Sequence, residues 1–263
     1  MSIEERINRF VGKWIRDLHP YKVERSQGLI KLDAMENPYP FPQEIRDSWV
    51  EVLSKVELNR YPDPEAKELR SSLRKSVGLE GDVEVLLGNG SDEIIHMLCV
   101  AFAQKGKGAM LCPEPTFSVY KIAAEALGMK YVGVPLRVKD FSLDMDAMLA
   151  AIKKHTPAII FLASPNNPTA NLLDAGVLAE VCRQSPGIVV LDEAYYRFSG
   201  ESRVKDVTEI ENLVVMHTLS KIGLAGIRIG ALFGAPEWID ILNRVRMPYN
   251  IGVLSQAAAT FAL

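Results

Sequence analysis

The sequence has few cysteines, and they form no pattern typical of a metal site or a disulfide framework. Its 263 residues include three cysteines, all in apolar stretches and none in a Cys-x-x-Cys or Cys/His cluster. Reduced thiols in the protein core are therefore expected, as in a cytoplasmic protein. Three of the four histidines are isolated from acidic or cysteine partners at ligand spacing, so no metal site is predicted. These residues are Cys99, Cys112, Cys182, His96, His155 and His217.

Long basic runs and long apolar runs are also missing. Lys and Arg number 30 against 33 Asp and Glu, and no basic stretch is interleaved with aromatic residues, so a nucleic-acid partner is not predicted. Charged residues interrupt the apolar positions of residues 1–18, which excludes a signal peptide there, and no segment resembles a membrane span. With 48% hydrophobic and 24% charged residues, the chain is large enough and apolar enough for a sizeable globular core.

From residue 83 onward, short apolar runs alternate with helical patterns. We expect strands near residues 83, 109, 131, 158, 187, 213 and 229, and helices near 92, 118, 144, 174 and 237. Alternation at this spacing predicts right-handed βαβ crossovers and a mostly parallel sheet, the α/β fold class. Two further helices are expected before this region, at about 43–58 and 65–77, separated by a proline-rich turn that contains Tyr61.

The N-terminal part has a different pattern. Residues 1–18 place apolar side chains at helical spacing between charges, which predicts a helix docked on its own protein or on a partner subunit. His19-Pro20-Tyr21 ends this helix. The proline-rich stretch 29–42 is interpreted as an extended arm that crosses between domains, with Leu32 and Met35 facing inward.

Lys221 has an unusual setting in the sequence. It follows the apolar strand pattern 213–216 and lies among small and apolar residues, with no acidic neighbour in sequence. Burial would lower the pKa of such an amine and make it a nucleophile able to form an imine with an aldehyde. A lysine that extends from a strand end to solvent is the alternative explanation.

Three other stretches favour the chemical interpretation. The apolar strand ending at Leu191 leads directly into Asp192, at the strand end where open α/β sheets bind ligands. Ser164-Pro165-Asn166-Asn167-Pro168-Thr169 follows another apolar strand and presents an Asn side chain from a proline-fixed loop. Gly88-Asn89-Gly90-Ser91-Asp92-Glu93 joins a strand to a helix N-terminus, which is typical of an anion site. It matches neither a dinucleotide fingerprint nor a P-loop.

In this order and spacing, the four stretches resemble the fold-type-I pyridoxal-phosphate enzymes, and within them the histidinol-phosphate aminotransferases. The most specific element is Asp192-Glu193-Ala194-Tyr195, followed about 25 residues later by Thr218-Leu219-Ser220-Lys221. The resemblance extends over nearly the whole chain. It implies a three-layer α/β/α fold with a mixed, mostly parallel seven-stranded sheet and an N-terminal helical arm.

The resemblance also implies a role for each matching residue. Lys221 would bind pyridoxal 5′-phosphate (PLP) covalently and move the proton, Asp192 would face the ring nitrogen, and Tyr195 and Asn167 would bond the phenolic oxygen. Phe117 would stack on the ring, and Tyr21 would reach the substrate. The phosphate would be bound by Ser91, Asp92, Glu93, Ser220 and Arg228, and by Tyr61 from the neighbouring subunit of a homodimer with shared active sites.

The sequence departs from the family pattern at two places. Ala170 stands where the family has a glycine, and the segment between Lys221 and Arg228 is one residue shorter than in most relatives. The apolar stretch 251–263 reads as a helix with no stop signal. We expect residues 1–45 to form an N-terminal helix and arm, residues 46–263 to form the large PLP-binding domain, and the C-terminal small domain to be absent, with weak transamination as a result.

The reaction implied by the resemblance is exchange of an amino group between L-histidinol phosphate and 2-oxoglutarate, in histidine biosynthesis. An aromatic aminotransferase or a phospho-amino-acid decarboxylase on the same scaffold is an alternative. A non-catalytic relative is a third possibility, and the complete set of Asn167, Asp192, Tyr195, Lys221 and Arg228 argues against it.

Overall fold

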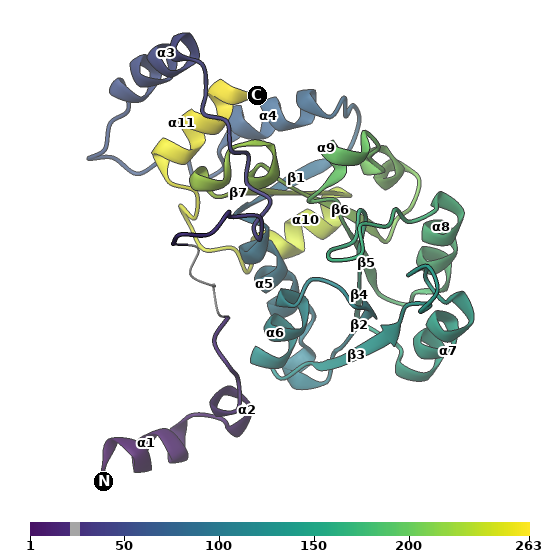
Figure 1. The fold of residues 1–263 in the computed structure, drawn as a ribbon. Coiled ribbons are helices and arrows are strands. Elements are labelled where there is room, and N and C mark those ends of the chain that lie inside the picture. The colour runs from purple at the N-terminus through teal and green to yellow at the C-terminus, as the bar shows by residue number, and fades with distance from the viewer. Residues whose placement is uncertain (22–26) are drawn as a thin grey trace.

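The computed structural model describes residues 1–21 and 27–263 and is organised around a single seven-stranded sheet (Figure 1). The strand order is β1-β7-β6-β5-β4-β2-β3, in which β7 runs antiparallel to both neighbours and all other adjacent pairs are parallel. The strands are β1 (Glu84–Asn89), β2 (Ala109–Glu114), β3 (Lys130–Pro135), β4 (Ile159–Ala163), β5 (Ile188–Asp192), β6 (Leu213–Thr218) and β7 (Ile229–Gly234). All seven predicted strands are confirmed.

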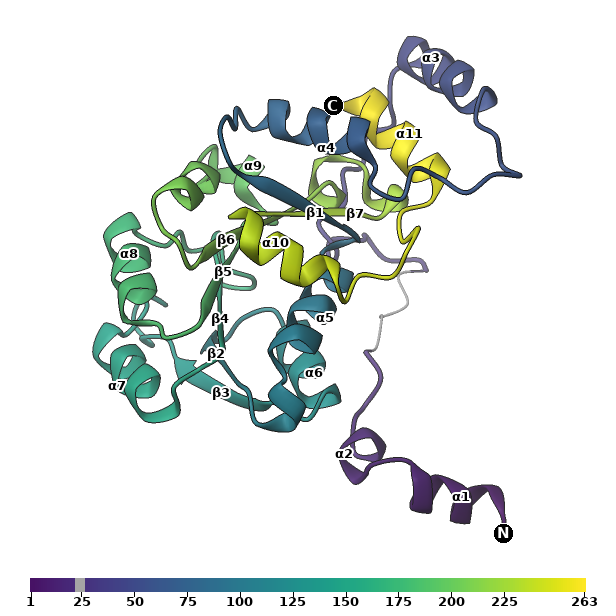
Figure 2. The same cartoon turned by 180° about the vertical axis from the view of Figure 1, so that it is seen from behind.

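Helices cover both faces of this sheet and form a three-layer α/β/α fold (Figures 1 and 2). One core cluster packs under α4 (Lys67–Ser76), α7 (Met145–His155), α8 (Ala175–Gln184) and α11 (Val253–Ala262). The opposite cluster packs under α5 (Ser91–Phe102), α6 (Val119–Ala126) and α10 (Pro236–Asn243). The predicted helices of the alternating region and the predicted fold class are therefore confirmed.

Alternate residues of each strand contribute to opposite clusters, because successive side chains of a strand point to opposite faces. In β5, Val189 and Leu191 face the α7 and α8 layer, whereas Ile188 and Val190 face the α5 and α6 layer. The strand is buried along its whole length. This alternation decides on which side of the sheet the polar residues at the end of β5 lie.

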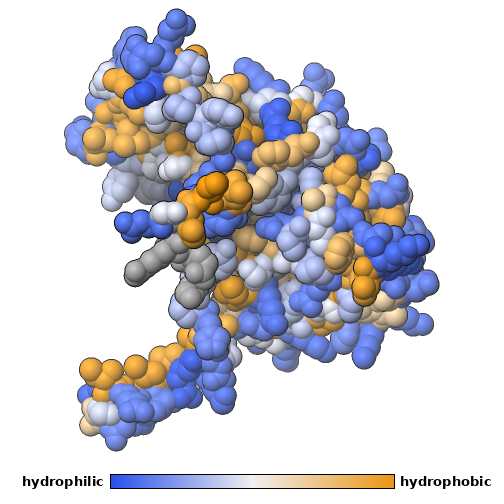
Figure 3. Space-filling view, viewed as in Figure 1, coloured by the Kyte–Doolittle hydropathy of each residue, from blue (hydrophilic) through white to orange (hydrophobic). Residues whose placement is uncertain are grey.

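The N-terminal segment extends away from this body (Figure 1). The helix predicted over residues 1–18 is two short helices, α1 (Ile3–Phe10) and α2 (Lys13–Arg16), interrupted at Val11 and Gly12. Ser2 and Glu5 form a capping box that fixes the start of α1. The apolar residues of α1 are exposed and gather along one side of the helix (Figure 3). The Trp14 Nε1–H donates to the Ala126 carbonyl at 3.3 Å and so anchors α2 to the C-terminal end of α6.

The arm follows next, and residues 22–26 of the segment 1–45 lie outside the described residues. Leu32 and Met35 were expected to face inward, but they are 78% and 47% exposed, so that expectation is wrong. Proline spacing predicts an extended chain but does not set which side chains face the body. Phe41 does pack, edge-on against Trp49 of α3 (Gln43–Ser54), with ring centroids 6.2 Å apart.

Within residues 1–21 and 27–263, no helix combines the length and the hydropathy needed to cross a membrane. The same residues contain no group of three or more His, Cys, Asp or Glu side chains able to hold a metal ion. The three cysteines lie in the core, where burial raises the pKa of Cys99 to about 12.

Candidate active site

Polar residues gather where the parallel strands end. The loops after β2, β4, β5 and β6 all leave the same edge of the sheet, since these four strands run in one direction. The turn from β1 into α5 and the chain entering β7 lie beside each other, because β1 and β7 pair from Glu84 with Gly234 to Asn89 with Ile229. Five segments that are distant in sequence are thereby brought to one region.

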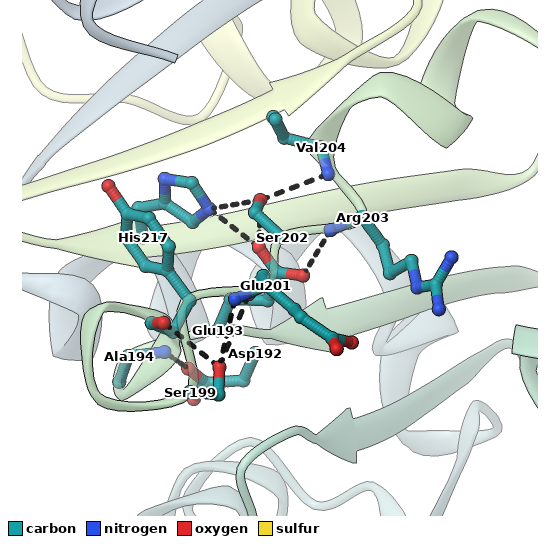
Figure 4. A network of polar contacts seen from close by, with 10 residues as sticks. Asp192, Glu193, Ala194, Ser199, Glu201, Ser202, Arg203, Val204 and His217 are labelled. Atoms are coloured by element: carbon teal, nitrogen blue, oxygen red, sulfur yellow. Dashed lines mark hydrogen bonds and ion pairs between the residues drawn. The ribbon is translucent and has the colours of Figure 1, made fainter. Parts of the chain in front are cut away.

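Asp192 is the last residue of β5 and is 5% exposed. Its position in the strand alternation directs it to the α5 and α6 layer, where the Tyr120 hydroxyl donates to Oδ2 at 2.5 Å. The Ala194 N–H donates to Oδ1 at 2.9 Å (Figure 4). Burial raises the pKa of the Asp192 carboxyl to about 6, although these two hydrogen bonds act in the opposite direction. A cationic partner placed beside it would favour the charged form.

Lys221 lies just beyond β6 and is half-buried. Its Nζ lies 5.6 Å from the centroid of the Tyr195 ring and donates to the carbonyl of Ala34 at 2.7 Å. The arm around Ala34 therefore crosses over this lysine. Burial lowers the pKa of Lys221. Burial, and next the nearby Asp192, raises the pKa of Tyr195, which keeps its hydroxyl protonated as a donor.

The N-terminus of α5 is an anion-binding geometry. Gly90 is the N-cap, and a glycine has no side chain that could cap the helix. The backbone N–H groups of the first turn are therefore not capped by it. Gly90 has φ +80°, and a Cβ there would lie 2.4 Å from Nη2 of Arg228, so only glycine admits the guanidinium. The Gly90 N–H donates to the Arg228 carbonyl at 2.8 Å, and Nη2 of Arg228 lies 3.0 Å from Asp92 Oδ2. The segment between Lys221 and β7 thus brings Arg228 to the helix start.

Two other predicted phosphate-binding residues are fixed by hydrogen bonds. Ser220 is 7% exposed, and its Oγ accepts a hydrogen bond from Thr218 Oγ1 at 3.0 Å. The Glu93 carboxylate accepts hydrogen bonds from the Asn89 N–H at 2.6 Å and from Asn250 Nδ2 at 2.8 Å. The Glu93 side chain therefore stabilises the turn. The backbone N–H of Glu93 points along the helix axis, as those of Ser91 and Asp92 do.

The loop after β4 is fixed by the first of its two asparagines. The Asn166 amide donates to the Pro115 carbonyl at 2.9 Å and to Thr169 Oγ1 at 2.8 Å, and its Oδ1 accepts from Thr116 Oγ1 at 2.8 Å. It therefore ties this loop to the one that carries Phe117. Asn167 is partly buried and has no side-chain hydrogen bond within residues 1–21 and 27–263, so its amide is free for a ligand.

Ala170 adopts the left-handed conformation with φ +61°, a backbone region that favours glycine. An alanine at such a φ costs roughly 1 kcal/mol relative to glycine. Hydrogen bonds from the Ala170 N–H to the Asn166 carbonyl at 2.7 Å and from the Asn166 N–H to the Asn171 carbonyl at 2.9 Å close the turn.

Sequence reasoning missed two residues of this region. Tyr120 lies three residues after Phe117, whose ring meets it edge-on at 5.6 Å, and only the first turn of α6 directs its hydroxyl to Asp192. The sequence signal for Tyr120 is a tyrosine on the inner face of a predicted helix. Asn166 was overlooked because its neighbour Asn167 has the same chemistry, and only the fold separates their environments.

Two predicted residues are less closely associated with this cluster. Tyr61 is 80% exposed and stacks on Tyr249 with centroids 4.5 Å apart, and none of its contacts within the described residues reaches Lys221. Tyr21 is 59% exposed and lies near enough to Tyr195 to contribute to its raised pKa. The remaining predicted residues lie on the five segments brought together at the end of the sheet.

Comparison with known proteins decides the family. A family model described as aminotransferase class I and II matches residues 27–263. The chain belongs to the class I and II aminotransferases. It is 48% identical over 260 residues to "Histidinol-phosphate aminotransferase 2" of Nitrosococcus oceani, covering 99% of this chain and 72% of that protein. It is also 48% identical over 262 residues to the protein of the same name from Cupriavidus pinatubonensis, covering 98% of this chain and 71% of that one.

A solved structure gives the same fold. The histidinol-phosphate aminotransferase of Sinorhizobium meliloti in complex with pyridoxal-5′-phosphate superimposes with a TM-score of 0.82 at 22% identity, covering 97% of this chain and 70% of that chain. The fold-type-I PLP fold expected for this aminotransferase is therefore confirmed. Aminotransferases of this family are PLP-dependent enzymes, and so is this one.

The residues present fit that cofactor. PLP has a phosphate, an aldehyde and a ring nitrogen that must stay protonated. The first turn of α5 with the Arg228 guanidinium suits the phosphate, a half-buried amine of lowered pKa suits the aldehyde, and the buried Asp192 carboxylate suits the protonated nitrogen. Each functional group of the cofactor therefore has a chemically matched partner in this region.

Proposed function

We propose that this aminotransferase exchanges an amino group between L-histidinol phosphate and 2-oxoglutarate, forming imidazole acetol phosphate and glutamate in histidine biosynthesis. The observation that carries the proposal is that relatives named histidinol-phosphate aminotransferase are 45% to 48% identical over 98% to 100% of this chain. The matched regions span all five segments of the candidate site.

We assign Lys221 as the residue that binds the cofactor and then moves the proton at the substrate carbon. When bound, PLP withdraws electrons from the carbon that loses its proton. The lowered pKa of Lys221 leaves a larger fraction of its amine unprotonated and able to accept that proton near neutral pH. Asp192 holds a proton on the ring nitrogen, and Tyr195 and Asn167 donate to the phenolic oxygen.

The cofactor phosphate is assigned to the start of α5. Backbone N–H groups of Ser91, Asp92 and Glu93 donate to it, together with the Ser220 hydroxyl and the Arg228 guanidinium. The contact between Arg228 and Asp92 keeps the guanidinium at the helix start before the phosphate arrives. Phe117 covers the ring, and Tyr21 approaches the substrate from the side of Tyr195.

The lysine assignment is tested by borohydride reduction of the holoenzyme followed by peptide mapping. The pyridoxyl mass is expected on the peptide that contains Ser220 and Lys221. A label on another lysine, such as Lys205, would contradict the assignment. Lys221→Ala serves as the matched control and should take up no label.

The substrate assignment is tested by glutamate formation from 2-oxoglutarate with a panel of amino donors. L-histidinol phosphate is expected to give the highest kcat/KM. A higher value with phenylalanine or tyrosine would instead identify an aromatic aminotransferase. Release of CO₂ from a phosphorylated amino acid would identify a decarboxylase.

We further propose that the protein acts in the cytoplasm as a homodimer with shared active sites. Tyr61 is exposed in one subunit and held against Tyr249, a position from which its hydroxyl is available to a neighbouring phosphate site. Exposed apolar side chains on α1 and the arm supply surface for the contact. The buried thiols suit a reducing compartment.

Subunit mixing tests the shared site. Tyr61→Phe and Lys221→Ala proteins should each be impaired, the first by roughly tenfold in cofactor affinity. Their mixed dimer contains one site with both residues intact, so activity should recover on mixing. No recovery in confirmed heterodimers would contradict the contribution of Tyr61 across the interface.

A further inference from the structure

A buried polar network lies beside the candidate site without belonging to it (Figure 4). Glu193 and His217 are 2% and 4% exposed, and Glu193 Oε2 lies 2.7 Å from Nε2 of His217. The same oxygen accepts from the Ser202 hydroxyl at 2.5 Å, and Oε1 accepts from the Arg203 N–H at 2.6 Å. Three partners thus converge on one carboxylate, which satisfies a charge that burial alone would make costly.

The imidazole of His217 is fixed by aromatic rings as well as by the carboxylate. The ring of Tyr196 stacks on it with centroids 4.1 Å apart and an interplanar angle of 15°. Phe233 of β7 meets it edge-on at 5.1 Å. With one nitrogen bonded to Glu193 and a face covered by Tyr196, the side chain has little freedom to adopt another rotamer.

The pair lies on the face of the sheet opposite to Asp192. Glu193 and His217 continue the alternation of Leu191 and Val215, which face the α7 and α8 layer, whereas Asp192 faces Tyr120. Neither side chain can therefore touch a ligand bound beside Asp192. Any influence on that ligand must pass through the backbone.

The backbone connection is short. The parallel pairing of β5 with β6 ends at Asp192 and Met216, with the Glu193 N–H donating to the Met216 carbonyl at 2.8 Å. Beyond Met216, among the described residues, β6 pairs only with β7, through His217 with Ala231 and Thr218 with Gly230. Among the described residues, the Glu193 to His217 contact is therefore the last hydrogen bond between the ends of β5 and β6 before the chain reaches Lys221.

We propose that Glu193 and His217 are positioning residues, which fix the segment bearing Lys221 relative to Asp192 by joining the ends of β5 and β6 from the far face of the sheet. The proposal rests on the assignment of Lys221 and Asp192 in the proposed function. The loop around Ser202 and Arg203 supplies the remaining hydrogen bonds to Glu193 but does not itself join the two strands.

The test is the pKa of Lys221 in the protein without cofactor, measured by NMR of isotopically methylated lysines. Glu193→Gln is isosteric but removes the charge, and His217→Leu removes the donor. Both are expected to raise the pKa of Lys221 by about 0.5 unit or more toward its ordinary value, because a loosened segment lets water reach the amine. Unchanged pKa values in both variants would overturn the proposal.

Two controls separate positioning from general stability. Ser202→Ala removes one hydrogen bond to the same carboxylate but keeps the link between strands, so the Lys221 pKa should stay as in the wild type. His217→Gln retains an N–H donor and should restore most of the effect lost in His217→Leu. If the Lys221 pKa follows only the melting temperature across all four variants, the proposal is contradicted. If His217→Leu does not fold, Glu193→Gln alone still tests the proposal.

The holoenzyme gives an independent readout. Both disruptive variants are expected to lower kcat by about tenfold while leaving KM within about twofold, since substrate contacts are unchanged. Borohydride labelling of the wild-type enzyme is run in parallel. Absence of label on Lys221 would contradict the proposed function, whereas a normal label with unaltered Lys221 pKa and kcat in the variants would contradict only the positioning role.

Discussion

The carboxyl edge of the sheet and the helix α1 near the N-terminus differ in how far their side chains are buried. Every residue of β5 and β6 is buried, and their polar ends have partners within the same domain. In contrast, α1 has a clear apolar side and no buried residue. Amphipathic pattern alone therefore does not say whether a covering surface exists in the same chain.

The difference is one of how the apolar surface is covered. A strand inside a sheet is covered by its neighbours and by a helix layer on each face, so its burial follows from the βαβ connections. A helix that precedes the sheet in sequence has no such constraint. Ile3 at 79% exposed and Ile160 at 0% exposed show how differently the same residue type is placed.

The largest expected effect compares two phenylalanines. Phe161 is 0% exposed and stacks on Tyr120 with centroids 4.6 Å apart, whereas Phe10 of α1 is 71% exposed. Phe161→Ala is expected to lower the free energy of unfolding by about 3–5 kcal/mol because it leaves a cavity. Phe10→Ala should change it by no more than about 0.5 kcal/mol. Urea denaturation at low protein concentration measures both, and a large cost for Phe10→Ala would show that its ring is covered in an assembly.

The next effect concerns catalysis at the buried edge. Asp192→Asn is expected to reduce kcat by about 10²- to 10³-fold, because a neutral amide does not stabilise the protonated ring nitrogen. The Tyr120 hydroxyl can reverse its hydrogen bond to the amide, so the fold should be kept. The exposed Asp240→Asn, whose carboxylate pairs with Arg244, is the control and should leave kcat unchanged. Normal turnover by Asp192→Asn would contradict the role of the carboxylate.

The same carboxyl makes the stability of the cofactor-free protein depend on pH. Burial raises the Asp192 pKa from 3.8 to about 6, so the folded state binds the proton more tightly than the unfolded state. The contribution of Asp192 is therefore most favourable below pH 3.8 and is lost as pH rises through about 6, by roughly 3 kcal/mol in total. Asp192→Asn should lack this loss. Unfolding free energies of both proteins from pH 4 to 7 measure the difference, and parallel curves would contradict the raised pKa.

The smallest effect tests the partner of Asp192. The hydrogen bond from Tyr120 lowers the pKa of this carboxyl, so Tyr120→Phe is expected to raise it further. At neutral pH kcat should fall by about tenfold or less, since one hydrogen bond to a charged group is lost. The acidic limb of the rate profile should move to higher pH. Tyr131→Phe, on β3 and away from Asp192, is the control, and an equal shift there would contradict a specific role for Tyr120.

Much of the fold could be predicted because its local signals agree with one another. Apolar runs marked all seven strands, and the turn at Gly88-Asn89-Gly90 marked the start of α5. Chemically distinctive residues such as Asp192 and Lys221 could be singled out, since each follows directly on a buried strand. The interruption at Gly12 and the exposure of Leu32 were not predicted, because both depend on what packs against the segment.

The sequence by itself determined the succession of strands and helices along the chain, the α/β class and the identity of the residues at the strand ends. Periodicity and glycine turns are local properties of the sequence, which is why they could determine these features. Only the tertiary structure decided which of those residues meet. The antiparallel insertion of β7 between β1 and β6 brings Arg228 to Gly90, and the alternation of β5 gives Asp192 to Tyr120 and Glu193 to His217. Such pairings depend on the order of the strands in the sheet and on the layer that each side chain faces. Both are set only by packing between residues that are more than 20 positions apart in the sequence, as Glu193 and His217 are.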